Sequence, residues 1–333
     1  SSKLSNFIGK KQITKEKLLT AVKEGNFFGI CKVRLTTPPD VINRYKDLGF
    51  PFIFDKKDVT ENMLSEEMLG IAKKHGRKFP QSVMTLCYNT DHRLIITPLL
   101  RFYLDLGLVV EELYYCMEFI EDTPFTKFVD ELVDLRVKSF GVNAPLGDRA
   151  KFSLNSAIGR FGMNIEKHRT TAFVKAENLW RHTQTPRLQS EHALQSEYDL
   201  GIHEVNKKRY KAIDKIPVQI SLFIYQRSKL WFYMFIKTLH EYLIPKEYKL
   251  LYMDTDSILI GLSGDSLDDI VTEEKKDEWK NVIKPEWFAD ETARSQKTPG
   301  LVKEEFSSKT GIFVGLRCVL FPNFLYNWCK NII

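Results

Sequence analysis

Two short apolar runs, at residues 249–253 and 258–262, bracket a turn that contains two aspartates, Asp254 and Asp256. Apolar runs of this length on either side of turn residues predict a β-hairpin with the acidic turn at its tip. Two carboxylates a few ångströms apart repel each other unless a cation neutralises them. Asp-Thr-Asp-Ser is also good chemistry for an ordinary polar turn, so the pattern alone leaves both interpretations open.

A divalent cation is the natural partner for such a pair. Mg²⁺ prefers a few carboxylates together with phosphate oxygens of a substrate, and Mn²⁺ accepts the same oxygen ligands. Two such ions can lower the pKa of a primer 3′-hydroxyl and neutralise a departing pyrophosphate. We therefore predict that Asp254 and Asp256 are metal ligands and catalytic residues.

The acidic turn also has a specific resemblance. Tyr252-Met253-Asp254-Thr255-Asp256-Ser257 is similar to motif C of family B DNA polymerases, Tyr-x-Asp-Thr-Asp-Ser. Reverse transcriptases typically carry adjacent aspartates, so the inserted threonine favours DNA-templated synthesis. The resemblance implies a DNA-directed DNA polymerase with template-primer DNA and dNTPs as partners, and it places Tyr252 at the dNTP site.

A second segment resembles the fingers motif of the same family, Lys-x-x-x-Asn-Ser-x-Tyr-Gly. Here the chain reads Lys151-Phe152-Ser153-Leu154-Asn155-Ser156-Ala157-Ile158-Gly159. Residues four apart share one face of a helix, and a lysine there can contact triphosphate oxygens. The predicted dNTP-binding residues of this segment are Lys151, Asn155, Ser156 and Gly159.

Two further points concern this site. Arg136, on the preceding predicted helix, lies on an apolar stripe and is predicted to contact the triphosphate, although it could equally snorkel to solvent. Ile158 replaces the tyrosine of the motif, so it keeps bulk but lacks the flat ring and the hydroxyl. Lys151 itself could be an ordinary solvated lysine.

Weaker matches point to the protein-primed subgroup, of the Maverick/Polinton, viral or linear-plasmid type. They include residues 99–108 and residues 228–230. This resemblance implies that a terminal priming protein is a candidate partner. Two family features are not found: residues 1–26 contain no aspartate for motif A, and the run Val319-Leu320-Phe321 stands where a Lys-x-Tyr is expected. We expect a partial polymerase that has little activity alone.

The implied fold is α+β, a right-hand palm with an antiparallel sheet and helical fingers, without the exonuclease and most of the thumb. The expected domains are the first part of the palm with a priming-region-like insertion at 1–120, fingers at 121–164, palm with the acidic hairpin at 165–306 and the start of the thumb at 307–333.

Local patterns predict several further elements. We expect strands at 27–35, 170–175 and 198–212, a strand or hairpin at 108–120, helices at 97–106, 126–140 and 217–242, and a loop-rich stretch from 36 to 78. Residues 141–147 are expected to be a loop, with Asp148 capping the next helix. The helix at 217–242 is apolar nearly all round, which predicts that it is buried.

Composition adds limits rather than identity. The net charge is +6, which permits a polyanionic partner without demanding one. Five scattered cysteines without a pairing framework indicate reduced thiols. The sequence shows neither a signal peptide nor an uninterrupted apolar span, so we expect an intracellular or intravirion protein, in host nucleus or cytoplasm, that is not secreted and has no membrane partner.

Nucleic-acid contacts are predicted at basic residues outside the motifs. These are Lys207, Lys208, Arg209, Lys303 and Arg317. The run at 206–211 is also compatible with a solvated hairpin. Two other functions remain open: an inactive nucleic-acid-binding relic of a polymerase, and a metal-dependent nuclease that uses the two aspartates.

Overall fold

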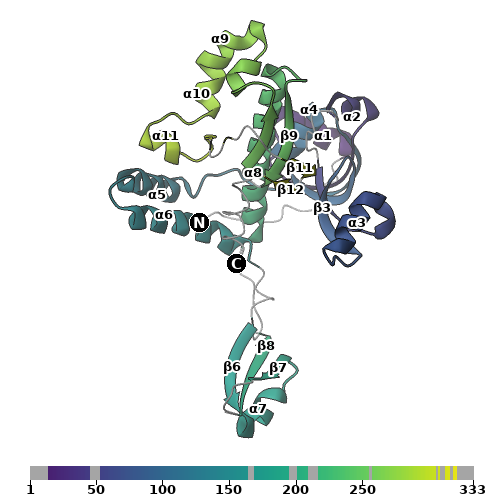
Figure 1. Cartoon of the computed structure of the whole chain (residues 1–333), viewed down its shortest axis with the longest axis vertical. Coiled ribbons are helices and arrows are strands. Elements are labelled where there is room, and N and C mark those ends of the chain that lie inside the picture. The colour runs from purple at the N-terminus through teal and green to yellow at the C-terminus, as the bar shows by residue number, and fades with distance from the viewer. Residues whose placement is uncertain are drawn as a thin grey trace. The chain divides into compact units, whose positions relative to one another are not determined.

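The computed structural model describes residues 14–45, 53–163, 169–194, 201–208, 217–254, 257–304, 307, 312–315 and 318–320; within these ranges the side chains of residues 83–86, 252, 254, 293, 312–315 and 318–320 are not described. Helices and antiparallel sheets are mixed, as expected for an α+β protein (Figure 1). The chain forms two compact units: unit 1 is Ser1–Ala150 with Phe223–Ile333, and unit 2 is Lys151–Leu222. Among the described helices, none is both long and apolar enough to cross a bilayer.

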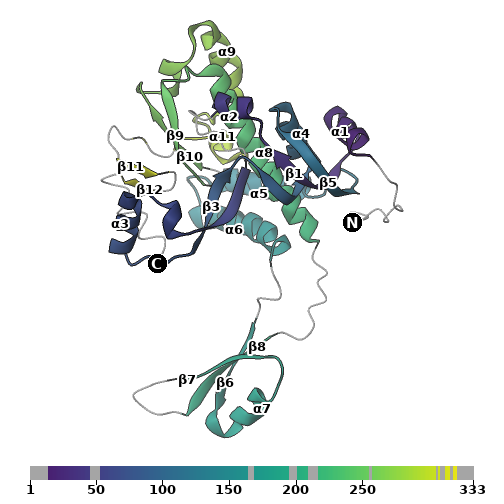
Figure 2. The same ribbon diagram turned by 90° about the vertical axis from the view of Figure 1, so that its right-hand side faces the viewer.

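Unit 1 is built on a three-stranded antiparallel sheet in the order β4-β1-β5. Every second residue of the middle strand (Cys31, Val33 and Leu35) is fully buried, so one face of the sheet forms the core. The helices α1 and α4 lie against each other beside this sheet (Figure 2). The strands and helices of this layer are α1 (Lys15–Glu24), β1 (Gly29–Thr36), β4 (Thr90–Ile96), α4 (Thr97–Asp105) and β5 (Val109–Glu118). The strands predicted at 27–35 and 108–120 and the helix predicted at 97–106 are therefore confirmed.

The stretch from 36 to 78 is not the loop-rich segment expected from its polar composition, and that prediction was wrong. It contains helices and a strand that pairs with a partner further along the chain, so local composition could not indicate the pairing. A continuous antiparallel register from Ile53↔Cys87 to Val59↔Gln81 joins the two strands. The elements are α2 (Pro39–Tyr45), β2 (Ile53–Val59), η2 (Glu61–Met63), α3 (Glu66–Lys74) and β3 (Gln81–Cys87).

The long helix α8 (Val218–Tyr242) is hydrogen-bonded to the edge strand β4 of the unit 1 sheet. The polar residue Gln226 interrupts the apolar run of this helix because its side chain binds the backbone of β4. Its side-chain oxygen accepts from the Ile96 N–H at 2.8 Å, and its amide nitrogen donates to the Leu94 carbonyl at 2.8 Å. These bonds satisfy backbone groups along the edge strand β4.

Helix α8 is not buried all round, contrary to the sequence-based expectation. Its buried residues follow a helical spacing: Phe232, Tyr233, Phe235, Ile236 and Leu239. Large residues on its other side are exposed, among them Tyr225 at 55% and Met234 at 41%. Apolarity is therefore not a sufficient sign of burial here.

The acidic hairpin and a set of short helices follow α8. The strands are β9 (Tyr248–Asp254), β10 (Ser257–Leu262), β11 (Ile312–Gly315) and β12 (Cys318–Leu320), and β11 and β12 lie beside β9 (Figure 2). The helical segments are η5 (Leu267–Ile270), η6 (Glu273–Lys275), α9 (Lys276–Glu278), the π-helical η7 (Trp279–Ile283), α10 (Lys284–Trp287) and α11 (Ala293–Lys297). Trp287 packs on Trp231 of α8, with ring centroids 4.4 Å apart.

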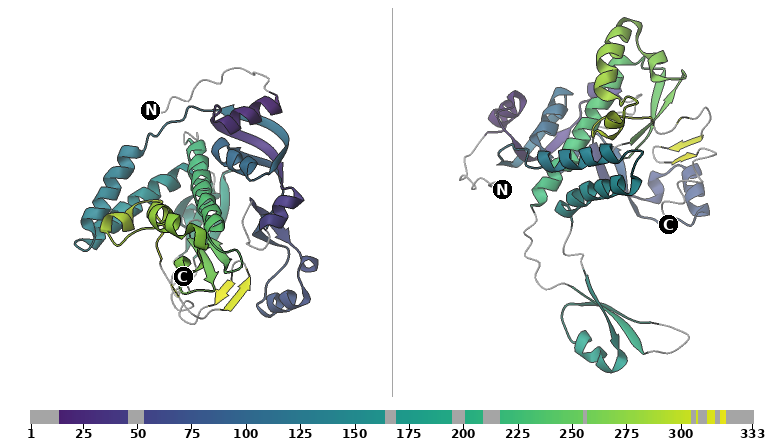
Figure 3. Two further views of the ribbon diagram at one scale, coloured as in Figure 1. Left: turned by 90° about the horizontal axis from the view of Figure 1, so that it is seen from above. Right: turned by 90° about the vertical axis from the view of Figure 1, so that its left-hand side faces the viewer.

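Helices α5 (Thr126–Ser139) and α6 (Ala144–Phe161) are joined by a short connection at residues 140–143 (Figure 3). The prediction that Asp148 caps the second helix was wrong. The helix begins at Ala144, so residues 144–147, which were predicted to belong to the loop, are helical. The Asn143 side-chain oxygen accepts from the Leu146 N–H at 3.2 Å. Asn143 and Asp148 are both good capping residues, so the sequence offered two candidate starts.

Unit 2 contains a three-stranded antiparallel sheet in the order β6-β8-β7. The strands expected near 170–175 and 198–212 are confirmed as β6 and β8, although residues 198–200 and 209–212 lie outside the described part of the chain. β7 was not foreseen. The elements are β6 (Arg169–Lys175), η4 (Ala176–Asn178), α7 (Leu179–Thr183), β7 (Leu188–Ala193) and β8 (Ile202–Lys208). Val205, in the middle strand, is fully buried.

Candidate active site

The predicted acidic hairpin is present. Its register pairs Met253 with Ile258 and Asp254 with Ser257, so the two strands are joined by a connection of two residues, Thr255 and Asp256. Two-residue connections are the commonest in antiparallel hairpins. Asp254 therefore stands at the last paired position before the tip. Thr255 and Asp256, and the side chains of Tyr252 and Asp254, lie outside the described part of the structure.

The base of the hairpin is firmly attached to unit 1. Tyr248 and Leu250 are buried, and the Ser263 N–H donates to the Glu247 carbonyl at 2.9 Å. The Ile244 N–H, just after α8, donates to the Ile270 carbonyl at 2.9 Å. The acidic end of the hairpin is thus carried on a strand whose other end is buried and hydrogen-bonded.

The donor set at this tip fits a hard divalent cation, because carboxylate oxygens are the ligands that Mg²⁺ and Mn²⁺ prefer. Among the described residues, no three His, Cys, Asp or Glu side chains gather as a metal site. Asp256 and the Asp254 side chain are not among the described residues, so this result does not concern the tip of the hairpin.

Helix α6 places all the predicted dNTP-binding residues of its motif on one exposed face. At 100° per residue, Lys151, Phe152, Asn155, Ser156 and Gly159 fall within about 140° of arc. All five are exposed, whereas Ser153, Leu154, Ala157 and Ile158 on the remaining arc are half-buried. A methyl group added at Gly159 would meet nothing within 4 Å. With respect to the described residues, this face of α6 is therefore exposed to solvent.

Phe152 is a residue of this face that the sequence reasoning missed. Its side chain is 72% exposed, which is unusual for a phenylalanine. It lies next to Lys151 and one turn before Ser156. Ile158 lies on the half-buried side, so Phe152 is the aromatic residue of the exposed face. In the sequence, only the position of Phe152 inside the Lys151–Gly159 motif indicated that it could belong to a binding face.

Arg136 is half-buried in α5, and within the described ranges its guanidinium has no ion-pair partner. Gly147 allows the first turn of α6 to approach the end of α5 closely. A Cβ at Gly147 would lie 2.8 Å from the Oγ of Ser139, a buried residue near the end of α5. The connection between α5 and α6 therefore depends on a glycine at this point.

The structure distributes these residues over both units. Asp254 and Arg136 belong to unit 1, while Lys151 and Asn155 belong to unit 2, so bringing them to one centre is part of the proposal below. Lys208 and Lys303 are exposed and Lys207 is half-buried. Arg209 and Arg317 lie outside the described residues.

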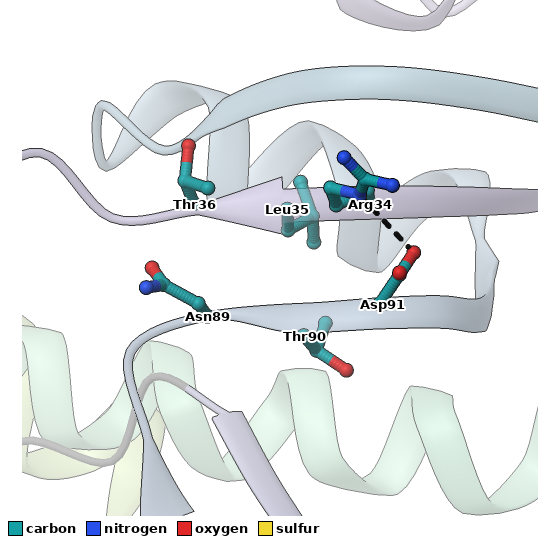
Figure 4. Close-up of a pocket in the computed structure, with 6 residues that line it drawn as sticks. All are labelled: Arg34, Leu35, Thr36, Asn89, Thr90 and Asp91. Atoms are coloured by element: carbon teal, nitrogen blue, oxygen red, sulfur yellow. Dashed lines mark ion pairs between the residues drawn. The ribbon is translucent and has the colours of Figure 1, made fainter.

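An open hollow of about 230 Å³ lies elsewhere in unit 1, between β1 and β4 (Figure 4). Its one arginine, Arg34, already pairs with Asp91 at 3.3 Å and with Glu112 at 3.1 Å. The Tyr114 hydroxyl donates to Asp91 at 2.6 Å, which lowers the pKa of that carboxyl and raises the pKa of Tyr114 to about 12. Its charges are satisfied internally, so it is a poor candidate for an anionic substrate.

The comparison with protein families gives an independent result. Residues 52–241 match the family described as DNA polymerase type B, organellar and viral, which covers more than half of the chain. No curated protein and no solved structure matches the chain. The family match runs from β2 through α5 and α6 to the end of α8, and it ends before the acidic hairpin. The chain belongs to the organellar and viral type B DNA polymerases, a family of DNA-directed nucleotidyltransferases.

Proposed function

We propose that this chain is the core of a DNA-templated DNA polymerase that adds dNTPs to a primer 3′-hydroxyl, in the replication of a virus or mobile element. The proposal depends on one observation: two separate stretches of the chain indicate the same activity. The family match covers residues 52–241, and the hairpin with Asp254 and Asp256 follows in a stretch that the match does not include. Both lead to the same chemistry.

Within this proposal, Asp254 and Asp256 hold the metal ions. Bound Mg²⁺ or Mn²⁺ would activate the 3′-hydroxyl and neutralise the pyrophosphate. Lys151 and Arg136 bind triphosphate oxygens, Asn155 and Ser156 hydrogen-bond near the sugar, and Tyr252 lies beside the nucleotide. Gly159 leaves room for close approach, which agrees with the empty space around it.

The assignment of residues to palm, fingers and thumb follows the resemblance to family B DNA polymerases. Residues 1–120 and 165–306 form the palm, residues 121–164 the fingers, and the thumb begins at 307. The inserted helices and strands between β1 and β4 correspond to a priming region, so the protein-primed subgroup and a terminal priming protein as partner belong to the proposal. The two helices α5 and α6, joined by a short connection, support the assignment of the fingers.

The first test measures binding of a fluorescent dNTP in the presence of Mg²⁺, which requires no turnover. Asp254→Asn and Asp256→Asn should each reduce Mg²⁺-dependent binding by about tenfold or more, because each removes a charge from the metal ligands. Primer extension by the unmodified chain should stay low, because two carboxylates are fewer than the family's three. Robust extension would contradict that expectation, and binding unaffected by both substitutions would contradict the proposed site.

The second test concerns the exposed face of α6. Lys151→Ala should weaken dNTP binding by about tenfold, because a charge-assisted contact to phosphate contributes roughly 1.5–3 kcal/mol. Lys127→Ala, at an exposed lysine of α5, is the charge-matched control and should bind as the unmodified chain does. Equal effects of the two substitutions would indicate a general electrostatic attraction instead of a site. A nuclease would cleave DNA in Mg²⁺ with no sensitivity to Lys151.

A further inference from the structure

The two faces of the unit 2 sheet differ: the first is covered, whereas the second is exposed along the edge strand β6, although Asn206 of the middle strand is buried there. Val205 is fully buried on the first, where the His203 ring nitrogen and the Glu191 carboxyl are hydrogen-bonded and Ala172 and Val174 are half-buried. The other face is lined by alternate residues of β6, among them Arg169, Thr171, Phe173 and Lys175, all of them exposed. This second surface, called here the open face, belongs to no site described so far.

Hydrogen bonds fix which residues share the open face. The Thr171 hydroxyl donates to the Asn206 side-chain oxygen at 2.6 Å, and the Asn206 amide nitrogen donates to Ser190 at 3.2 Å and to Glu204 at 2.8 Å. The cross-strand register places Lys208 opposite Arg169 and Glu204 opposite Phe173. Since Lys207 precedes Lys208 in the strand, it points to the opposite face.

Phe173 is the central feature of the open face. Its side chain is 66% exposed, although a phenylalanine on a sheet is normally packed against a neighbouring element. It stands on an edge strand, beside a polar network instead of an apolar cluster. An exposed ring on a flat polar sheet is the arrangement on which bases of single-stranded nucleic acids stack.

The charges around Phe173 favour a polyanion. Arg169, Lys175 and Lys208 have no carboxylate partner among the described residues. Arg169 and Lys208 are directly opposite each other, which is unfavourable in the free protein and would be relieved by a phosphate. Glu204 is an acidic residue on this face, and it accepts a hydrogen bond from Asn206.

The whole of unit 2 has the same bias. Residues 151–222 contain twelve lysines and arginines against seven aspartates and glutamates, a net charge of +5. The complete chain has a net charge of +6, so nearly all its excess positive charge belongs to unit 2. Contacts of lysine and arginine side chains with the phosphates of a nucleic acid give much of the affinity of nucleic-acid binding.

We propose that the open face of the β6-β8-β7 sheet binds single-stranded DNA, with a base stacked on Phe173 and phosphates at Arg169 and Lys208. The site lies outside both motifs of the proposed active centre. It rests on the proposed function only for the identity of the nucleic acid as DNA.

The test is fluorescence anisotropy of a labelled dT12 oligonucleotide with the full chain. Phe173→Ala should weaken binding by about fivefold or more, because a stacked base is lost. Phe173→Trp should restore binding to within about twofold of the unmodified chain, since it keeps a larger flat ring. Both variants should melt at the same temperature as the unmodified chain, because the side chain is exposed.

Charge substitutions test the face. Arg169→Ala and Lys208→Ala should each reduce the slope of log K against log salt by about 0.7. Lys207→Ala, on the opposite face, should have a smaller effect than its neighbour Lys208→Ala. Glu204→Gln should strengthen binding, because it removes the carboxylate next to Phe173 and keeps the Asn206 bond. Lys246→Ala, at an exposed lysine that belongs to unit 1, is the control and should leave dT12 binding nearly unchanged.

Several results would overturn the proposal. One is unchanged dT12 binding by Phe173→Ala; another is an equal loss of duplex binding, which would indicate a non-stacking role. Tighter binding of rU12 than of dT12 would overturn the choice of DNA. Duplexes with a single-stranded extension on either the template or the opposite strand would distinguish which strand occupies the face.

The same variants separate this proposal from the polymerase proposal. Phe173→Ala should leave Mg²⁺-dependent dNTP binding unchanged. If the unmodified chain fails to bind dNTP but its dT12 binding requires Phe173, the open face stands and the polymerase site falls. If dNTP binding behaves as predicted and Phe173→Ala binds dT12 normally, only the open-face proposal fails.

Discussion

At the scale of single residues, Lys229 is the most unusual cation of unit 1. Its ammonium lies 5.2 Å from the ring centroid of Tyr233 and 5.8 Å from that of Phe54. Within the described residues it has no carboxylate within ion-pair distance. Asp55, which also lies nearby, pairs with Arg93 at 3.2 Å instead. Burial, together with the positive charge of Arg93, lowers the pKa of Lys229 to about 8.

A pH dependence of stability follows from this shift. Between pH 8 and pH 10.5 the unfolded chain holds more protons at this lysine than the folded chain does. The free energy of unfolding should therefore rise with pH across that window, and the cost of the buried charge should be fully present below pH 8.

Lys229→Met should remove that dependence and stabilise the protein at pH 7 by on the order of 1–3 kcal/mol, discounted for partial exposure. Urea unfolding at pH 7, 8.5 and 10 measures both effects. Lys237→Met, at a lysine of α8 that pairs with Glu241 at 3.0 Å, is the control and should not reproduce them. A Lys229→Met variant that is less stable at pH 7 would contradict this account.

At the scale of elements, the connection between α5 and α6 depends on a close approach at Gly147. A helical glycine normally costs about 0.5–1 kcal/mol relative to alanine. Gly147→Ala should nevertheless destabilise the protein by roughly 1–2 kcal/mol, because its Cβ would stand 2.8 Å from the buried Ser139 Oγ.

Gly70 provides the matched control for this element. It lies inside α3, and a methyl group added there would meet nothing within 4 Å. Gly70→Ala should stabilise by up to about 1 kcal/mol, the normal helix preference. Thermal unfolding of the two variants should therefore show shifts of opposite sign. Shifts of the same sign would mean that the α5–α6 contact does not govern the effect.

At the scale of the whole molecule, the charge is divided unequally between the two units. Neutralising three basic residues of unit 2 (Arg160, Lys175 and Lys207) to glutamine should weaken binding of dT12 and reduce its salt dependence. The same change at Lys17, Lys246 and Lys280 of unit 1 should have a much smaller effect on dT12 binding. Salt titrations of the two triple variants measure this, and equal losses would show that only total charge matters.

The sequence by itself determined the elements whose signal is local. The hairpin of β9 and β10, the helices α4, α5 and α8 and the strands β1, β5 and β6 all lie where alternation, helical spacing and turn residues predicted them. The two motifs likewise identified the polymerase family, and the match over residues 52–241 agrees with them. These signals are contained in short stretches of chain, so they can be read without knowing what lies beside them.

Only the tertiary structure decided what depends on distant partners. β2 and β3 were missed because each completes its hydrogen bonds on the other, and α8 was predicted to be buried although one side of it is exposed. The choice of Asn143 over Asp148 as cap and the exposure of Phe152 and Phe173 also required the fold. Burial and pairing are properties of two segments brought together, so no single stretch of sequence contains them.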